Sequence, residues 1–174
     1  MKNNRLYKIC LTGLFAAMIA VLTAFVKIPV GMNSGYIHVG DSLIYIAGCI
    51  LGPLGMVASS VGGALADIMA GAAVWAFPTA IIKIFNCIPF IIATRIYKKK
   101  TGKFKVVNVY TLIMTVVSGL VTAGGYFLAE GIMYTFPTAF TGLPFSFVQA
   151  AGSGVVFVLI GKAFDSAKPE RFMR

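Results

Sequence analysis

The stretch SLIYIAGCILGPLGMVASSVGGALA, Ser42 to Ala66, decides how this chain folds. It contains no charged residue, and the turn-forming run GPLG at positions 52–55 interrupts it. If the stretch is one helix, the later helices have one orientation. If the chain turns at Pro53, two helices replace one, and every later helix runs in the opposite orientation. The rest of the chain distinguishes these two alternatives.

Composition indicates an integral membrane protein. The 174 residues are 59% hydrophobic and 11% charged, and the mean hydropathy is +0.90, whereas a soluble domain has about 25% charged residues. A membrane span must satisfy its own backbone hydrogen bonds, so it is a helix or part of a closed barrel. The apolar runs here are long and do not alternate, which predicts an all-α membrane protein with a single domain over residues 1–174.

The basic residues favour the turn at Pro53. Six of them lie between Arg95 and Lys105, and three lie before position 9. Clusters of this kind mark cytoplasmic loops, so an even number of spans must separate them. The predicted spans are roughly 9–26, 39–52, 54–73, 78–97, 106–129 and 145–161. This topology has six transmembrane helices and two cytoplasmic termini, and it places thirteen of the fifteen basic residues in the cytoplasm. The net charge of +10 therefore reflects membrane orientation and not a nucleic-acid partner.

Polar residues inside an apolar frame predict a functional site near the extracellular ends of the helices. Ionisable groups in a membrane are costly and by default mark function. The candidates for hydrogen bonds to a ligand are His38, Asp41, Asp67, Lys83, Asn86, Glu130 and Gln149. The candidates for aromatic stacking are Trp75, Tyr126 and Tyr134.

Structural roles are the alternatives for several of these side chains. Asp67 and Lys83 are close enough along the predicted bundle to form an ion pair without any ligand. Asp41 is placed to cap the second helix, and His38 to cap a turn. The aromatic residues are of the types that anchor proteins at membrane interfaces.

Several classes of function are disfavoured by missing motifs. The run from Gly35 to Ser42 has glycines spaced as in a phosphate-binding loop, but Asp41 stands where that motif needs lysine. One histidine and three separate cysteines make neither a zinc site nor a disulfide framework. Ser/His and paired-acid arrangements are absent from the sequence, so we expect no enzyme, no metal and no cofactor. A stand-alone carrier or channel is an alternative, although its polar path through the inner half would be sparse.

Small residues in the first span predict a contact with a partner. Ala16, Ala20 and Ala24 recur every four residues and form a smooth helix face. In lipid, such faces allow two helices to approach closely.

The chain resembles the S components of energy-coupling factor (ECF) vitamin transporters. The resemblance rests on Ala16-x3-Ala20, GYIHVGD at 35–41, LGP at 51–53 and GGALAD at 62–67, and it extends over nearly the whole chain. It is similar above all to the group named for riboflavin, which also includes carriers of pyridoxine and hydroxymethylpyrimidine.

The resemblance implies a substrate-binding subunit in the cytoplasmic membrane of a bacterium. Such a subunit captures a vitamin from outside, with the first loop as a lid, and topples in the bilayer after docking on a T component driven by two ATP-binding subunits. It implies that the alanine face of the first helix meets the T component. The expected ligand is a small heteroaromatic vitamin or precursor of the pyridoxine or hydroxymethylpyrimidine type, with riboflavin as the alternative.

Overall fold

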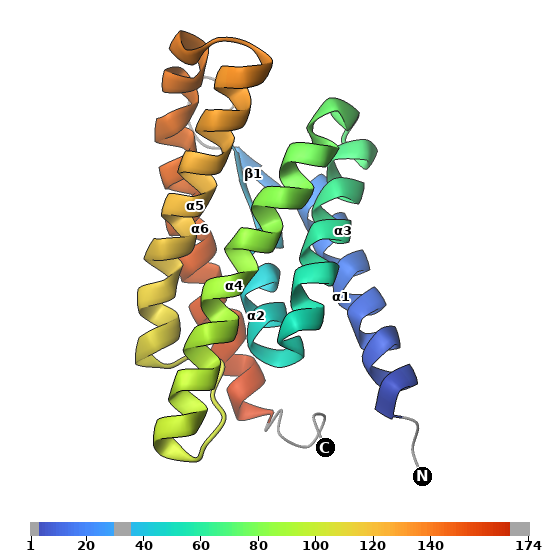
Figure 1. Cartoon of the computed structure of the whole chain (residues 1–174), viewed down its shortest axis with the longest axis vertical. Helices are drawn as coiled ribbons and strands as arrows, with labels where there is room; N and C mark the ends of the chain where they lie inside the picture. The colour runs from blue at the N-terminus through green and yellow to red at the C-terminus, as the bar shows by residue number, and fades with distance from the viewer. Residues whose placement is uncertain (1–3, 30–35, 168–174) are drawn as a thin grey trace.

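The computed structural model describes residues 4–29 and 36–167, and within them it shows a bundle of helices with one short β-hairpin (Figure 1). Six α-helices are present in these residues, as the sequence predicts. The elements in chain order are α1 (Asn4–Phe25), β1 (Lys27–Pro29), β2 (Tyr36–His38), α2 (Gly40–Leu51), α3 (Pro53–Met69), the 3-10 turn η1 (Ala73–Trp75), α4 (Ala76–Thr101), α5 (Val109–Met133) and α6 (Phe136–Ser166).

The helices differ in their capacity to cross a membrane. By length and hydropathy, four spans qualify among the described residues: Arg5–Phe25, Ala73–Thr101, Val109–Met133 and Phe136–Ser166. The other two helices are shorter, with 12 residues in α2 and 17 in α3. The all-α membrane class is thus supported, and a crossing by each of the six helices stays a prediction.

The break between α2 and α3 lies where the sequence predicts it. Gly52 has φ of +59°, a backbone conformation that favours glycine, and Pro53 follows as the first residue of α3. Gly55 then lets the two helices approach closely, because a Cβ there would lie 2.6 Å from the carbonyl oxygen of Ala47. The charge-free stretch is therefore a tight antiparallel pair of helices.

Helix α2 is buried on all sides. Its residues Leu43–Ala47 are each at most 2% exposed, and α2 packs against α1, α3, α4 and α6. The ring of Tyr45 stacks on that of Phe90, with centroids 4.3 Å apart, and meets the edge of Phe157. A helix that is apolar on all its faces is typical of a protein core. The polar residues of α2 lie in its first turn, which is in the middle of the bundle.

Helix α6 begins nine residues before the predicted span at 145. The side chain of Thr135 caps it by accepting a hydrogen bond from the N–H of Thr138 at 3.4 Å, and a proline lies in its first turn. The predicted span leaves Gly142 and Pro144 outside the helix, whereas the structure includes both in α6. A proline inside a membrane helix is tolerated, however, because neighbouring helices and hydroxyl side chains satisfy the freed backbone groups. The result is a long α5–α6 pair joined by a short turn.

The small-residue face of α1 is covered by the chain itself. Ala16 and Ala20 are only 8% and 3% exposed, and α1 packs along α3. A Cβ on Gly62 of α3 would lie 2.7 Å from the carbonyl oxygen of Ala16, so the two backbones nearly touch. The expectation that this face meets a T component stays a prediction, because the structure describes only the packing of Ala16 and Ala20 within the chain. Small residues favour close packing within one chain as readily as between chains.

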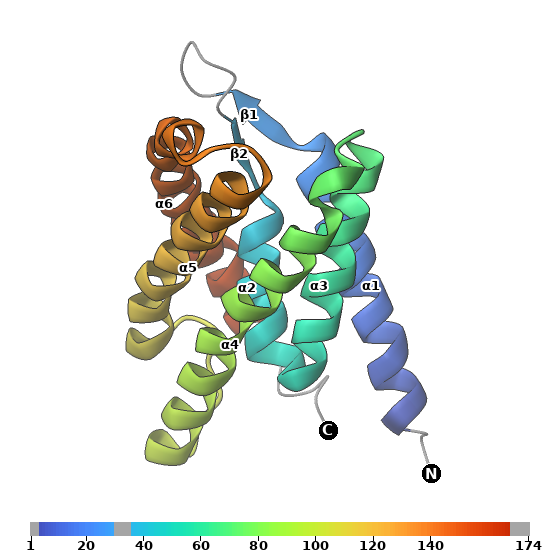
Figure 2. The ribbon, with the colours of Figure 1, turned by 45° about the horizontal axis from the view of Figure 1, so that its top comes forward.

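The two ends of the bundle differ in character. The start of α1, the end of α6 and the α4–α5 connection lie at one end (Figure 1). At the other end, the hairpin lies between the α5–α6 pair and the α1–α3 pair (Figure 2). The arrangement agrees with two termini and a basic loop on the same side of a membrane, which stays a prediction because no membrane is present. Ala24, the third alanine of the α1 face, lies near the hairpin end and is half-buried.

Candidate functional site

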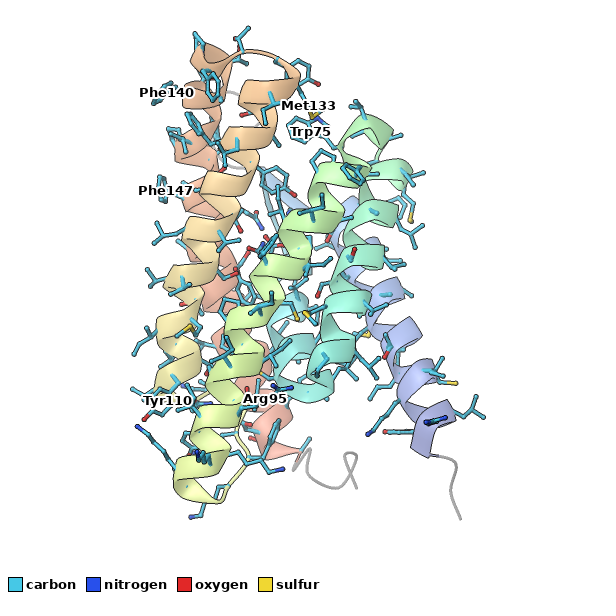
Figure 3. The ribbon with its side chains drawn as sticks, viewed as in Figure 1. Trp75, Arg95, Tyr110, Met133, Phe140 and Phe147 are labelled. Atoms are coloured by element: carbon cyan, nitrogen blue, oxygen red, sulfur yellow. The ribbon has the colours of Figure 1, made fainter. Side chains whose placement is uncertain are left out.

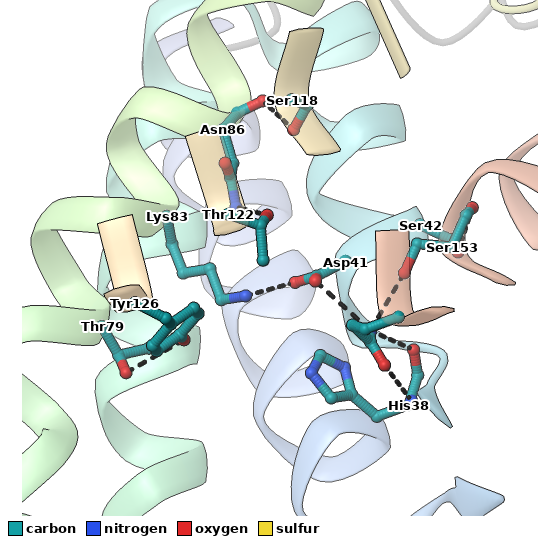
Figure 4. Close-up of polar contacts among 11 residues, drawn as sticks. His38, Asp41, Ser42, Thr79, Lys83, Asn86, Ser118, Thr122, Tyr126 and Ser153 are labelled. Carbon is teal, nitrogen blue, oxygen red and sulfur yellow. Dashed lines mark hydrogen bonds and ion pairs between the residues drawn. The ribbon is translucent and has the colours of Figure 1, made fainter. Parts of the chain in front are cut away.

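A buried ion pair lies at the start of α2. The Nζ atom of Lys83, on α4, is 2.5 Å from Oδ1 of Asp41, and the two side chains are 2% and 1% exposed (Figure 4). Lys83 thus has Asp41 as an ion-pair partner, where the sequence suggests Asp67. The capping alternative is wrong, because Asp41 lies inside α2, whose N-cap is Val39 with no capping side chain. Sequence spacing gives the face of a helix but not which helix stands opposite.

Gln149 of α6 connects this pair to the hairpin. Its Oε1 accepts a hydrogen bond from the backbone N–H of His38 at 2.9 Å, and its Nε2 lies 3.1 Å from the carbonyl oxygen of His38. The same Nε2 is 3.3 Å from Oδ2 of Asp41 and 3.0 Å from Oγ of Ser153. An amide nitrogen carries two hydrogens, so it serves two of these three acceptors at a time. Gln149 therefore fixes β2 and α2 to α6.

Asn86 lies on α4, one turn beyond Lys83, and holds α5. Its side-chain Nδ2 donates to Oγ1 of Thr122 at 3.0 Å, and its backbone carbonyl oxygen accepts from Oγ of Ser118 at 3.3 Å. Asn86 is fully buried and does not line the cavity described below. The sequence predicts that Asn86 contacts the ligand, whereas the structure places it in the contact between α4 and α5.

Aromatic side chains form one wall of the site. The hydroxyl of Tyr126 is 3.2 Å from Oγ1 of Thr79, and the Nζ of Lys83 is 5.4 Å from the centroid of the Tyr126 ring. The ring of Trp75 is 6.0 Å from that of Tyr126 and 6.0 Å from that of Tyr134. Tyr134 is 55% exposed and supports Trp75 from outside. These contacts hold the Tyr126 and Trp75 rings in place without a ligand.

These groups surround a cavity of about 400 Å³ near the hairpin end of the bundle. Eight of the ten predicted substrate-binding residues line it, namely His38, Asp41, Asp67, Trp75, Lys83, Tyr126, Glu130 and Gln149, while Asn86 and Tyr134 do not. The other seven lining residues are outside the predicted set, namely Thr23, Ala72, Thr79, Thr122, Gly142, Phe145 and Ser146. Phe145 and Ser146 precede Gln149 by four and three residues, so helical spacing from Gln149 would have found them.

A second hollow lies between α5 and α6 and is of another kind. Its volume is about 430 Å³, and apolar or small residues such as Val116, Leu120, Phe147 and Val155 line it almost entirely. Phe147 points away from the bundle (Figure 3). A hollow with so few hydrogen-bonding groups is poorly suited to orient a polar ligand, so the polar cavity is the candidate site. Within residues 4–29 and 36–167, no group of three or more His, Cys, Asp or Glu side chains is placed to hold a metal ion.

Long apolar helices around a polar cavity open at one end define a membrane protein with a site for a small molecule. Comparison with known proteins shows the family to which the chain belongs. A family model described as "ECF-type riboflavin transporter, S component" matches residues 3–166. The chain belongs to this family, which is one of membrane transport subunits and not of enzymes.

One relative is a protein of Pyrococcus woesei described as "Uncharacterized protein in gap 3'region". It is 41% identical over 66 residues, which are 37% of this chain and 44% of that protein. The match thus spans less than half of either protein.

Proposed function

We propose that this chain is the substrate-binding subunit of an ECF-type importer, and that it captures a small heteroaromatic vitamin or precursor of the pyridoxine or hydroxymethylpyrimidine type. The observation that carries the proposal is the cavity of about 400 Å³ with an aromatic wall on one side and hydrogen-bonding groups on the other. Sites for small molecules combine apolar walls with a few placed polar groups. A flat ring fits against Trp75 and Tyr126, and its substituents reach the polar side chains.

The polar groups have distinct roles in this proposal. Lys83 and Asp41 are already paired, so they present a fixed dipole to the ligand and need no rearrangement when it binds. Gln149 holds the backbone of His38 at the mouth of the cavity, which positions the hairpin over a bound molecule. Thr79 and Thr122 offer hydroxyl groups from α4 and α5. Each is a contact from a rigid helix, so little conformational entropy is lost on binding.

Riboflavin is the second candidate. The description of the matching family supports it, and so does the volume of the cavity, which lies within the range of about 300–1,000 Å³ typical of sites for drug-sized ligands. The sequence favours a smaller ligand because Lys83 and Glu130 are compatible with a polar heterocycle carrying hydroxyls, and it leaves riboflavin open because it gives no cavity volume.

We also propose that uptake needs a T component and two ATP-binding subunits, because the family is that of transporter S components and the glycine-rich run at 35–42 lacks the lysine of a phosphate-binding loop. A stand-alone carrier is the alternative. Vesicles containing the purified chain, with and without an ATP-driven partner module, distinguish the two. Uptake by the chain alone would contradict the proposed dependence on partners.

Native mass spectrometry of the purified protein tests the choice of ligand. The expected result is a co-purified mass that matches pyridoxine, hydroxymethylpyrimidine or riboflavin, released on unfolding. Calorimetry with the same three compounds then ranks their affinities. If none of the three binds, the proposed ligand class is wrong.

A further inference from the structure

Charged residues are distributed differently in the cavity and in the chain as a whole. The chain contains fifteen Lys and Arg residues and five Asp and Glu residues. The cavity is lined by three of the five acidic residues, Asp41, Asp67 and Glu130, but by one Lys or Arg residue, Lys83, together with His38. A strongly basic protein thus surrounds a site that is rich in carboxylates.

Lys83, the single Lys or Arg residue of the described lining, is already engaged. Lys83 lies 2.5 Å from Asp41, and both side chains are almost completely buried. No other Lys or Arg is present among the cavity-lining residues that the structure describes. A negatively charged ligand would therefore meet the carboxylates of this lining, and like charges repel one another more strongly in a cavity partly shielded from solvent than in bulk water.

Glu130 occupies the part of the cavity between α5 and α6. It lies in the last turn of α5 and lines the cavity together with Gly142 of α6. A Cβ on Gly142 would lie 2.7 Å from Oε2 of Glu130, so the carboxylate rests over the glycine backbone. An ionised carboxylate only accepts hydrogen bonds. The ligand group that faces it must therefore donate, as a hydroxyl, a ring N–H or an amine does.

We propose that the cavity admits only ligands without negative charge, and that Glu130 is a specificity-determining residue that excludes the phosphorylated form of the same vitamin. This inference rests on the proposed function and adds the charge class of its ligand. A phosphate monoester carries a charge of about −1.5 to −2 at neutral pH and offers acceptor oxygens. At Glu130 both properties are unfavourable, because charge meets like charge and acceptor meets acceptor.

Calorimetry of the purified full-length chain with two matched pairs of compounds tests the inference. The pairs are pyridoxine with pyridoxine 5′-phosphate, and riboflavin with riboflavin 5′-phosphate. For whichever vitamin binds, we expect the phosphorylated form to bind at least about tenfold more weakly. Glu130→Gln removes the charge at nearly constant size, and it should reduce this ratio several-fold. Glu130→Asp keeps the charge and should keep the discrimination.

Asp165→Asn is the control for a general effect of charge, because Asp165 lies at the opposite end of α6, and this variant should leave the ratio unchanged. Equal affinity of the wild-type protein for both members of a pair overturns the inference while the proposed function stands. An unchanged ratio in Glu130→Gln overturns the role of Glu130 and points to size as the cause. If none of the four compounds binds, the proposed function fails and the inference fails with it. Should Glu130→Gln not fold, the ratio in the wild-type protein and in Glu130→Asp still decides.

Discussion

The ion pair of Lys83 and Asp41 contributes both to the stability of the fold and to the lining of the cavity. Removing two charges from water is costly, and their attraction offsets this cost only when the geometry is good and the remaining polar atoms are satisfied. Here the amide of Gln149 lies within hydrogen-bonding distance of the second carboxylate oxygen. The side chains thus stabilise one another while facing the site, so a single substitution will affect both folding and binding.

Lys83→Met should lower the free energy of unfolding by about 3–5 kcal/mol, because it leaves Asp41 buried without its partner. The double variant Lys83→Met with Asp41→Asn should recover most of this stability, since no buried charge remains unpaired. It should still bind ligand more weakly than the wild-type protein. Unfolding in detergent, followed together with calorimetry, separates the two effects. Equal stability of the single and double variants would contradict the account of the pair.

The sequence predicts which polar residues belong to the site, but it does not predict which of them contact one another. Asp41, Lys83 and Gln149 stand out because polar residues in apolar helices are rare and costly. Their mutual contacts depend on α2 lying between α4 and α6, and no local pattern encodes that arrangement. Asn86 is an example. It shares a helix face with Lys83, but its side chain donates a hydrogen bond to α5 and does not line the cavity.

Helices α1 and α3 pack closely because small residues line their contact. Ala16 is buried there, whereas its neighbour Ala17 is exposed. Ala16→Trp should therefore destabilise the protein by about 1–3 kcal/mol or more, because overpacking forces the helices apart. Ala17→Trp is the matched control and should leave the unfolding temperature nearly unchanged. Similar unfolding temperatures for the two variants would contradict this packing.

Gln149 makes two hydrogen bonds that link β2 to α6. Gln149→Ala removes both hydrogen bonds to the backbone of His38. Each is worth about 0.5–1.5 kcal/mol, so the amide of His38 should exchange hydrogen several-fold faster in exchange mass spectrometry. Thr115→Ala, whose hydroxyl bonds only within α5, is the control. Unchanged exchange in Gln149→Ala would show that the hairpin is held by other contacts.

Some elements were predictable because their signals are local. The turn at Gly52 and Pro53 combines a positive φ with a favoured first residue of a helix. The role of Asp165 was not predictable: its two carboxylate oxygens accept hydrogen bonds from the N–H groups of Val106 and Val107, at 2.7 and 3.0 Å. These two hydrogen bonds join residues that are 59 and 58 positions apart in the sequence, and no local sequence pattern predicts them.

The molecule as a whole has a basic end and a ligand-binding end. The lysine-rich end of α4 lies with the start of α1 and the end of α6 (Figure 1), and we expect this end to be cytoplasmic. A Lys99→Cys variant in a Cys10→Ser background should resist an impermeant maleimide added to intact cells. Thr138→Cys, at the start of α6 and exposed, should react. The reverse pattern would overturn the orientation.

Ligand binding in the polar cavity, and not in the apolar hollow, is the point on which the whole account depends. Ser146 lines the first and Val116 the second, and each lies on a helix. The most direct measurement is a calorimetric titration of pyridoxine, hydroxymethylpyrimidine and riboflavin into the wild-type protein, Ser146→Trp and Val116→Trp. We expect one of these compounds to bind the wild-type protein and Val116→Trp with similar affinity, and Ser146→Trp to show no binding although it remains folded. Binding retained in Ser146→Trp and lost in Val116→Trp would contradict the account.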